Sequence, residues 1–315
     1  MRPGIWRLRL PLPWSNSPHG NAWALAAGDG IVLVDTGYAG SDGSRQLEFA
    51  LAQVGFELAD INLVVCTHTH ADHYGLAGPI LDAAGCELWM HPAWGHVRRM
   101  VEDPETALER QLALARDAGV PDELVEGLRH ARRGTGSGVA RIAEPDRELT
   151  TGDEVETDHG IWHVHETPGH APSHIVLHQP ESGLLISGDH LGGKVFLFFD
   201  YGHTPDPVGE FKTSLDVVEA LETRLCLPGH GRPYRDIPGK VSAYRREVDG
   251  HLAVVRKALA DGPRTTFEVV SAFLGGREMP AGVLGWGLQV VSAYLDHVVA
   301  LGEVVEVDGS YRLSG

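Results

Sequence analysis

Three histidines and an aspartate lie within six positions of the segment LVVCTHTHADHYG, residues 63–75. The segment starts as an apolar run typical of a buried strand, so the polar residues follow the strand end. Residues i and i+2 of an extended chain point to the same side, so His68 and His70 can present two ring nitrogens to one metal ion. Asp72 and His73, where the chain turns toward a helix, can reach a second ion. The spacing therefore predicts two adjacent metals; an exposed loop that happens to carry histidines is the alternative.

Three further polar residues close apolar runs downstream. His170 lies in ETPGHAPSH, Asp189 in LLISGDH and His230 in LCLPGHG. Each run is a predicted strand with a glycine beside the polar residue, and the carboxyl ends of strands share one edge of an open sheet. Four separate segments can therefore meet at one site. The seven residues divide between a first ion, a second ion and a carboxylate that bridges both: His68, His70 and His170; Asp72, His73 and His230; and Asp189.

The elements expected around these residues alternate strands with helices, which indicates an α/β fold. The predicted strands are residues 23–27, 31–34, 61–66, 87–91, 154–157, 161–166, 174–178, 184–187 and 224–227. The predicted helices of the same region are residues 45–54, 76–84 and 208–221. Residues 92–138 differ in character, with helical patterns at 105–118 and 122–133, and are predicted to be an inserted helical lid.

The C-terminal part has a different pattern. Three predicted helices, residues 240–260, 266–274 and 283–301, precede a hairpin around Asp308-Gly309. This order suggests a catalytic domain of residues 1–238 and a small winged-helix-like domain of residues 239–315. The third helix contains no lysine or arginine, so nucleic-acid binding is disfavoured and a structural cap or homodimer element is expected.

Composition narrows the function classes. The chain has 315 residues and a net charge of −17, which repels phosphate backbones unless a local basic patch exists. Three cysteines without a CxxC pair suit a reducing compartment. The N-terminus lacks an unbroken apolar signal region, and no window resembles a membrane span. We therefore expect a cytoplasmic protein with no membrane association.

The motifs HTHADH, PGH, GDH and PGH, in this order, resemble those of the metallo-β-lactamase superfamily. VDTG at residues 34–37 resembles the first motif of that superfamily, and the similarity covers roughly Trp23 to Gly231. The resemblance implies a four-layer αβ/βα sandwich with the metals at one sheet edge. It also implies that Asp35 orients a metal ligand, for which an ordinary turn-capping aspartate is the alternative.

Differences between branches of the superfamily indicate which of its activities this sequence favours. True β-lactamases with this fold carry cysteine or serine where Asp189 stands, so penicillin hydrolysis is disfavoured. The aspartate resembles that of hydroxyacylglutathione hydrolases, lactonases and RNA-processing enzymes. Persulfide dioxygenases lack the complete second site that His73 and His230 provide here. Glutathione thioesterases end in a helical domain that holds the tripeptide, whereas this tail resembles the winged helix of some endoribonucleases.

These features predict a hydrolase with two divalent ions, expected to be zinc, with iron or manganese as alternatives. A water that bridges two dications becomes a hydroxide near neutral pH and can attack a carbon or phosphorus. The first ion would polarise the substrate carbonyl, and the second would stabilise the departing thiolate or alkoxide. We expect the substrate to be a thioester, a lactone or another small acyl compound. The alternative is a metal-dependent endoribonuclease or phosphodiesterase.

Substrate specificity is expected from the helical insert and from GGKVFLFFDYGHTPDP, residues 192–207. This segment offers an apolar surface of four aromatic residues, Phe196, Phe198, Phe199 and Tyr201. Tyr201 and His203 are the candidate catalytic residues of this wall, since His203 could bind substrate or protonate a leaving group. Packing of the aromatic rings onto the sandwich is the alternative. An apolar wall favours an acyl chain over a nucleic acid.

Overall fold

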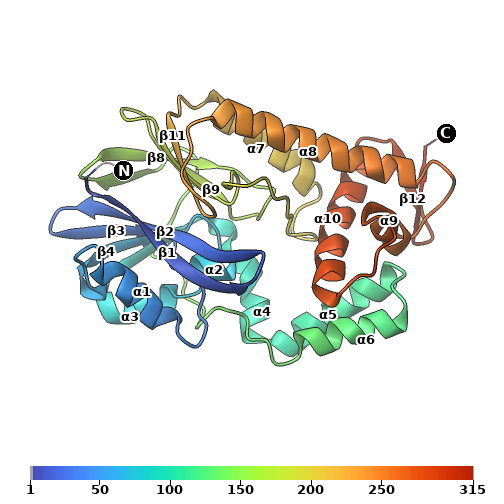
Figure 1. Ribbon diagram of the computed structural model, residues 1–315, viewed down its shortest axis with the longest axis horizontal. Helices are drawn as coiled ribbons and strands as arrows, with labels where there is room; N and C mark the ends of the chain where they lie inside the picture. Colours follow the sequence, from blue (N-terminus) through green and yellow to red (C-terminus); the bar gives the residue numbers. More distant parts are fainter. Residues whose placement is uncertain (1–2, 315) are drawn as a thin grey trace.

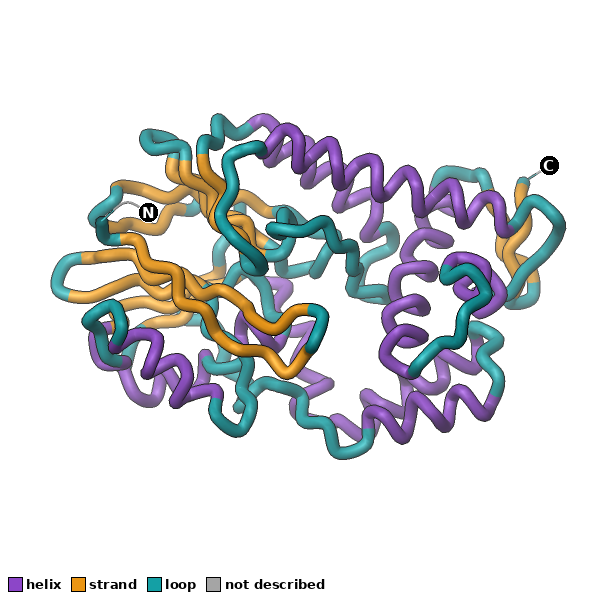
Figure 2. Tube along the Cα trace, viewed as in Figure 1, coloured by secondary structure: helices purple, strands orange, loops and turns teal. Residues whose placement is uncertain are grey.

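Two β-sheets face each other, and helices cover their outer surfaces (Figure 1). The computed structural model describes residues 3–314. Figure 2 shows the two sheets on the left with helices on their outer sides, and a group of helices with a short pair of strands on the right. This helix, sheet, sheet, helix order is the predicted four-layer αβ/βα sandwich, so the fold prediction is confirmed.

The first sheet has six strands in sequence order. They are β1 (Ile5–Trp14), β2 (Ser17–Ala27), β3 (Gly30–Val34), β4 (Ile61–Val65), β5 (Glu87–Met90) and β6 (Arg147–Glu148). The strands β1 to β3 pair antiparallel, and β3 to β6 pair parallel through connections that carry helices. The parallel part matters most for the site because its strands end at the same edge.

The second sheet has five strands in the order β11-β10-β9-β8-β7. They are β7 (Glu154–Thr157), β8 (Gly160–Glu166), β9 (Ile175–Gln179), β10 (Leu184–Gly188) and β11 (Leu225–Pro228). Only β10 and β11 pair parallel, and the helix between them crosses the outer face. A separate hairpin of β12 (Val304–Val307) and β13 (Ser310–Leu313) lies at the C-terminal end, where it was predicted.

The helices fall close to their predicted positions, with additional short ones. They are α1 (Gly43–Ala52), η1 (Leu58–Asp60), α2 (Ala71–Tyr74), α3 (Ala77–Ala84), η2 (Pro92–Val97), α4 (Arg98–Glu102), α5 (Pro104–Asp117), α6 (Asp122–Arg132), α7 (Pro207–Ala220), α8 (Ile237–Ala258), α9 (Thr266–Phe273) and α10 (Ala281–Ala300). Asp206 is the N-cap of α7: its side chain accepts from the Gly209 N–H at 2.8 Å, and Pro207 occupies the first turn.

Strand β1 was not predicted from the sequence. Leu8, Leu10 and Leu12 alternate as buried residues along it, which is a strand pattern. Pro11 and Pro13 interrupt this pattern, and proline cannot donate to a sheet ladder. The strand forms nevertheless because β1 is the edge strand of its sheet, and the pairing with β2 shifts register between Pro11 and Trp14.

Three buried clusters hold these layers together. The cluster between the sheets contains Trp23, Val34, Trp162 and Ile186. A second cluster lies between the first sheet and its helices α1 and α3. The third cluster joins the second sheet to α7, α8 and the C-terminal helices, and it also includes Leu112 and Val125 of the insert. The insert therefore packs on the C-terminal part rather than standing free.

Helix α10 is long and apolar enough to cross a membrane by length and composition. The expectation that no segment has this character is therefore wrong for α10. Half of its most apolar window is buried inside the protein, and Val290 and Tyr294 are fully covered. These are the surroundings of a core helix. The domain boundary at residue 238, the winged-helix resemblance of residues 239–315 and the absence of membrane association stay predictions.

Candidate metal centre

The four candidate ligands of HTHADH follow β4, at the carboxyl edge of the first sheet. His68 follows the strand, His70 caps the start of α2, and Asp72 and His73 lie on that helix. The second sheet faces this edge, since the Ile175 N–H donates to the Thr67 carbonyl at 2.8 Å. The loops that follow β8, β10 and β11 bring in the three remaining residues, His170, Asp189 and His230.

The first predicted group contains His68, His70 and His170, whose ring nitrogens converge. His70 Nδ1 lies 3.0 Å from His68 Nε2 and 3.0 Å from His170 Nε2. Burial and the neighbouring imidazoles lower the pKa of His68 well below its usual range, and they lower the pKa of His170 to about 4. These two rings are neutral near pH 7, so their lone pairs are available to a cation.

The second predicted group contains Asp72, His73 and His230. His230 Nε2 lies 3.0 Å from the Asp72 carboxylate, and His73 Nε2 lies 3.6 Å from it. The Asp189 carboxylate lies between the two groups: its oxygens are 3.3 Å from His230 Nε2, 3.4 Å from His73 Nε2 and 3.8 Å from His170 Nε2. The structure therefore brings all seven predicted ligands together, with Asp189 in the bridging position.

Two buried atoms at the centre of this cluster have no hydrogen-bond partner among the described residues. They are His73 Nε2 and Asp189 Oδ1. Buried polar atoms without a partner are costly, and a ring nitrogen facing a carboxylate oxygen needs a positive charge between them, either a proton on the ring or a bound cation. The donor set of imidazoles and carboxylates is the set that divalent metals take in proteins, so the residues fit such ions.

The glycines beside these residues are required by close approach. A Cβ on Gly229 would lie 2.7 Å from His73 Cε1 and would also meet the Asp189 carboxylate. A Cβ on Gly188 would lie 2.7 Å from His174 Nε2. Gly229 is therefore required because a side chain there would occupy the space of two candidate ligands, and Gly188 because a side chain there would displace His174.

Comparison with known proteins decides the family. The profile of the metallo-beta-lactamase superfamily matches residues 18–230, which contain all seven candidate ligands. The chain belongs to this superfamily. A Bacillus subtilis (strain 168) protein named "Probable metallo-hydrolase YqjP" is 28% identical over 254 residues, which cover 78% of this chain and 77% of the relative.

Solved metallo-beta-lactamase structures match the whole chain. A family protein from Thermus thermophilus has a TM-score of 0.84 at 26% identity and covers 99% of both chains. A beta-lactamase domain protein from Burkholderia ambifaria has a TM-score of 0.84 at 26% identity, covering 100% of this chain and 93% of its own. The C-terminal helices and the insert therefore belong to the same fold in these relatives. Membership in the superfamily and the metallo-hydrolase relative show a metal-dependent hydrolase.

Asp35 of the superfamily's VDTG motif contacts a candidate ligand. It lies at φ +64°, in the left-handed region, and is buried. Its carboxylate accepts from His73 Nδ1 at 2.8 Å and from the Thr67 N–H at 2.8 Å. This bond leaves His73 Nε2 as the nitrogen that faces the metal position. The orienting role assigned to Asp35 stays a prediction, which this geometry supports.

Asp200 makes an equivalent contact on the first group and was not predicted. Its carboxylate lies 2.8 Å from His70 Nε2 and 3.3 Å from His96 Nε2. Burial raises the pKa of Asp200, but His70 and His96 outweigh it and hold the value well below its usual range. Asp200 lies in the segment after β10, which forms no helix or strand, so no periodic pattern marked its position. The contact with this ionised carboxylate leaves His70 Nδ1 as the nitrogen that faces His68 and His170.

His174 orients the Asp189 loop and was not predicted either. Its Nε2 accepts from the backbone N–H groups of Asp189 at 3.1 Å and His190 at 3.2 Å. The proton of the ring must therefore be on Nδ1, which donates to the Thr167 hydroxyl at 2.8 Å. Burial and His170 lower the pKa of His174 well below its usual range, consistent with this neutral ring. The sequence signal that could have located His174 is its position four residues after the candidate ligand His170.

The aromatic segment of residues 192–207 divides between the site and the core. Phe198 lies edge-on to His70 and His170, with ring centroids 5.6 and 5.8 Å away. Phe199 is fully buried against Phe211 and Tyr294. The structure thus places Phe198 at the predicted wall, and the packing alternative holds for Phe199.

The two candidate catalytic residues of this segment lie in different places. His203 is at the rim, with its ring centroid 5.3 Å from that of His96. Tyr201 packs against the core that includes the C-terminal helices, and its backbone N–H donates to Gln289 of α10. The structure does not bring Tyr201 together with the seven ligands. The catalytic roles of Tyr201 and His203 stay predictions.

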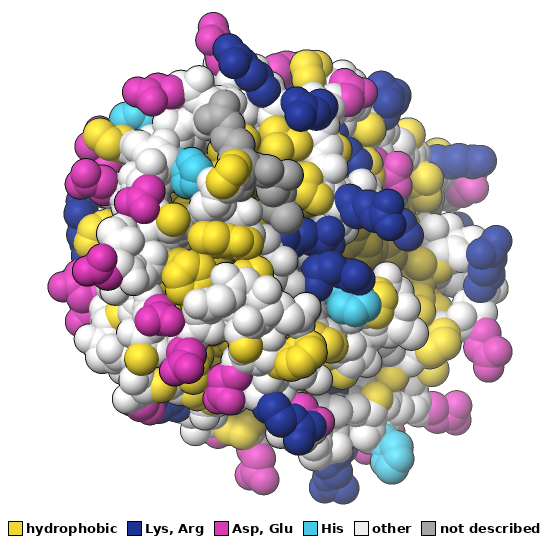
Figure 3. Space-filling view, turned by 60° about the vertical axis from the view of Figure 1, so that its left-hand side comes forward, with side chains coloured by type: hydrophobic (Ala, Val, Ile, Leu, Met, Phe, Trp, Pro, Cys, Tyr) yellow, Lys and Arg dark blue, Asp and Glu magenta, His cyan; other side chains and the backbone are white. Residues whose placement is uncertain are grey.

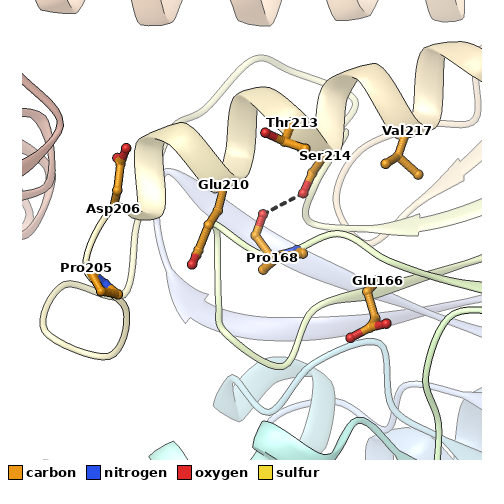
Figure 4. Close-up of a pocket in the computed structure, with 8 residues that line it drawn as sticks. All are labelled: Glu166, Pro168, Pro205, Asp206, Glu210, Thr213, Ser214 and Val217. Atoms are coloured by element: carbon orange, nitrogen blue, oxygen red, sulfur yellow. Dashed lines mark hydrogen bonds between the residues drawn. The ribbon is translucent and has the colours of Figure 1, made fainter. Parts of the chain in front are cut away.

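A cavity of about 440 Å³ lies beside α7 rather than at the metal centre. Glu166, Asp206 and Glu210 give it an acidic lining, and the Ser214 hydroxyl donates to the Pro168 carbonyl at 2.8 Å (Figure 4). None of the seven candidate ligands lines this cavity. Pro168 of the PGH loop that carries His170 lines this cavity, and the Ser214 bond joins that loop to α7.

Proposed function

We propose that this metallo-β-lactamase family member hydrolyses a thioester, a lactone or another small acyl substrate at two divalent ions. The observation that carries the proposal is the position of the Asp189 carboxylate, within 3.8 Å of ring nitrogens from both ligand groups. A carboxylate so placed can bind two ions at once through its two oxygens, whereas cysteine or serine at this position offers a single ligand atom. This argues for a binuclear hydrolase and against penicillin hydrolysis.

Zinc is the proposed metal, with iron or manganese as alternatives, because the donor set combines imidazoles with carboxylates. Two such ions would lower the pKa of a water and stabilise negative charge that develops on the substrate. His68, His70 and His170 would hold one ion, and Asp72, His73 and His230 the other. Asp35 and Asp200 hold the ring orientations of His73 and His70 by hydrogen bonds.

The remaining residues of the wall position the substrate. The edge of Phe198 covers His70 and His170 and limits water access from that side. His203 lies at the rim beside His96 and is the proposed proton donor to a leaving group. A metal-dependent endoribonuclease or phosphodiesterase stays the alternative, since the same ions can act on phosphorus.

The proposed setting is the cytoplasm, with a small acyl molecule as the partner, no nucleic-acid or membrane association, and a homodimer as the proposed assembly. Cys66, Cys86 and Cys226 are free thiols, which suits a reducing compartment. The exposed apolar residues of the C-terminal part, among them Val299, Leu301 and Val307, support a second copy as a partner.

Elemental analysis, coupled to turnover of an acyl thioester, a lactone and a short RNA, tests this proposal. About two metals per chain with ester or thioester cleavage would support it. Cleavage of RNA alone would favour the phosphodiesterase. Absence of bound metal after reconstitution with zinc, iron or manganese would overturn the assignment of a binuclear centre.

A further inference from the structure

The hairpin of β1 and β2 borders the second ligand group. His230 Nδ1 lies 3.2 Å from the His19 carbonyl and 3.1 Å from the Ser17 hydroxyl, and both residues belong to β2. Asn21 fixes the hairpin to the His230 loop, because its side-chain amide donates to the carbonyls of Pro228 at 2.7 Å and Gly231 at 3.0 Å. Side chains on this face of the hairpin therefore have a fixed position relative to His230.

Three arginines lie around this contact. Arg7 and Arg9 are two residues apart on β1 and share one face, and Arg9 pairs in register with Asn21. The Arg7 Nε donates to Asn21 Oδ1 at 2.8 Å, and the Arg9 guanidinium lies 3.2 Å from His19 Nδ1. Arg232 follows His230 by two positions. Arg232 also follows Gly231, whose carbonyl accepts from the Asn21 amide that anchors Arg7 on its other side. Burial lowers the pKa of Arg7, and the charges of Arg9 and Arg232 lower that pKa further, so both of these guanidiniums lie near that of Arg7.

No carboxylate neutralises this arginine cluster of Arg7, Arg9 and Arg232. Among residues 3–314, none of the three has an ion-pair partner within 4.0 Å, whereas Arg141 and Arg245 each contact aspartates at 2.6 Å. The chain carries 43 acidic and 26 basic residues, so an excess of basic residues does not explain why these three arginines lack acidic partners. Lysines and arginines gather beside a hollow on one face of the molecule (Figure 3). Repulsion within such a group is relieved when an anion binds.

We propose that the arginine cluster binds an anionic group, a carboxylate or a phosphate, on the leaving part of a small acyl substrate. This inference rests on the proposed function. The cluster borders His230, which belongs to the group whose ion would stabilise the departing thiolate or alkoxide. The anionic charge of the substrate is therefore expected on its leaving group and not on its acyl part. Guanidiniums bind carboxylates and phosphates through paired N–H donors, which suits both groups.

A small anion fits this cluster better than a nucleic acid does. A strand of RNA presents a row of phosphates and needs a basic track. The arginine cluster instead contains two residues on one face of β1 and one residue in the loop after β11. The long apolar helix α10 has no lysine or arginine to extend such a track.

Three butanoyl thioesters that differ in the leaving thiol test this inference on the metal-loaded full chain. The thiols are N-acetylcysteamine, which is neutral, N-acetylcysteine, which adds a carboxylate, and coenzyme A, which adds phosphates. We expect at least about a tenfold higher kcat/KM for one of the anionic esters, reduced by added salt. The double variant Arg9→Gln/Arg232→Gln should lower this preference about tenfold, mainly through KM. Arg277→Gln, exposed in the loop between α9 and α10, is the matched control and should retain the preference.

Calorimetric titration of the three free thiols separates failure of this inference from failure of the proposed function. Arginine-dependent binding of an anionic thiol without turnover of any ester would support the cluster and contradict the acyl hydrolase. Turnover of all esters with equal kcat/KM, or equal losses in the double variant for neutral and anionic esters, would overturn the inference and leave the hydrolase intact. Arginine-dependent binding of a short RNA, with no preference among the thiols, would overturn the small-molecule assignment.

Discussion

The two halves of the metal centre hold their ligands in opposite electrostatic states. In the first group, burial lowers the pKa of His170 to about 4 and that of His68 well below its usual range. In the second group, burial also lowers the pKa of His230, but the carboxylates of Asp189 and Asp72 outweigh it and raise the value to about 10. The first half is therefore a set of mostly neutral donors, and the second half without metal is a network of ion pairs.

This difference shows how one sheet edge can present two unlike sites. His70 is the exception in the first half, since Asp200 outweighs burial and raises its pKa. Metal binding at the second half must displace protons from histidines that pair with carboxylates, while His68 and His170 in the first half have none to lose. The metal affinities of the two halves should therefore respond differently to pH and to the removal of single carboxylates.

Removal of a ligand from either half should have the largest effect. His70→Ala, His73→Ala and Asp189→Ala are each expected to lower kcat/KM by more than about a thousandfold, because the chemistry depends on the ions. Steady-state kinetics on the best acyl probe would measure this loss, with circular dichroism to verify folding. His130→Ala, exposed on α6, is the control. Full turnover in the folded ligand variants would show that this cluster is not the active site.

Metal content should distinguish the halves in the same variants. His70→Ala should weaken retention of the first ion and His73→Ala that of the second, whereas Asp189→Ala should affect both. Elemental analysis after dialysis against a weak chelator measures the stoichiometry. Identical metal loss in the His70 and His73 variants would contradict two separable halves.

Stability of the metal-free protein should fall as pH rises from 6.5 toward 10. The His230 pKa is raised from 6.5 to about 10 in the folded state. Its contribution is therefore fully present below the unfolded value and is lost as pH rises through the folded value. In the metal-loaded protein a cation takes the place of the proton, so the fall in Tm should be smaller. Thermal melts with and without chelator at both ends of this range measure the difference.

His230→Asn sharpens this pH comparison. The variant lacks the titrating ring, so its metal-free Tm should depend less on pH over the same interval. His130→Asn should keep the slope of the parent protein. Parallel Tm curves for metal-free and loaded protein would contradict the ion-pair account of the second half.

The two orienting carboxylates should have smaller, separate effects. Asp35→Asn is expected to weaken metal binding at the second half and Asp200→Asn at the first, each by about 10- to 100-fold. The physical reason is that each carboxylate fixes the ring of one ligand histidine, His73 or His70. Competition titrations with a chromophoric chelator would measure both affinities. Equal weakening of both sites by either variant would instead indicate a general loss of structure.

Loss of the Tyr201 hydroxyl should have the smallest effect. Tyr201→Phe is expected to change kcat/KM by less than about twofold, because the ring packs with the C-terminal core and mutations away from a site are usually mild. His203→Gln provides the comparison at the rim and should lower kcat more than KM if the ring donates a proton. A larger loss of kcat/KM in Tyr201→Phe than in His203→Gln would contradict the assignment of His203, and not Tyr201, as the proton donor.

Sequence patterns predicted the seven candidate ligands that the structure brings together, because most of them follow a strand end and have a glycine or an i+2 partner beside them. His68, His170 and Asp189 show this, since strand ends have a fixed relation to a sheet edge. Asp200 and His96 could not be located, because they lie in a loop and a 3₁₀ helix whose positions depend on packing. Tyr201 was a candidate from residue type alone, and residue type does not determine which way a loop side chain points.

The third buried cluster has a consequence for how the chain unfolds. Its residues come from the insert, the second sheet and the C-terminal helices, as Val125, Leu185 and Tyr294 illustrate. A chain truncated near residue 238 would expose the apolar faces of α6 and α7 to water, and exposed apolar surface of this kind promotes aggregation. The C-terminal helices therefore shield apolar surface of the insert and of the second layer of helices from water. Loss of the tail should reduce soluble yield before any effect on chemistry becomes measurable.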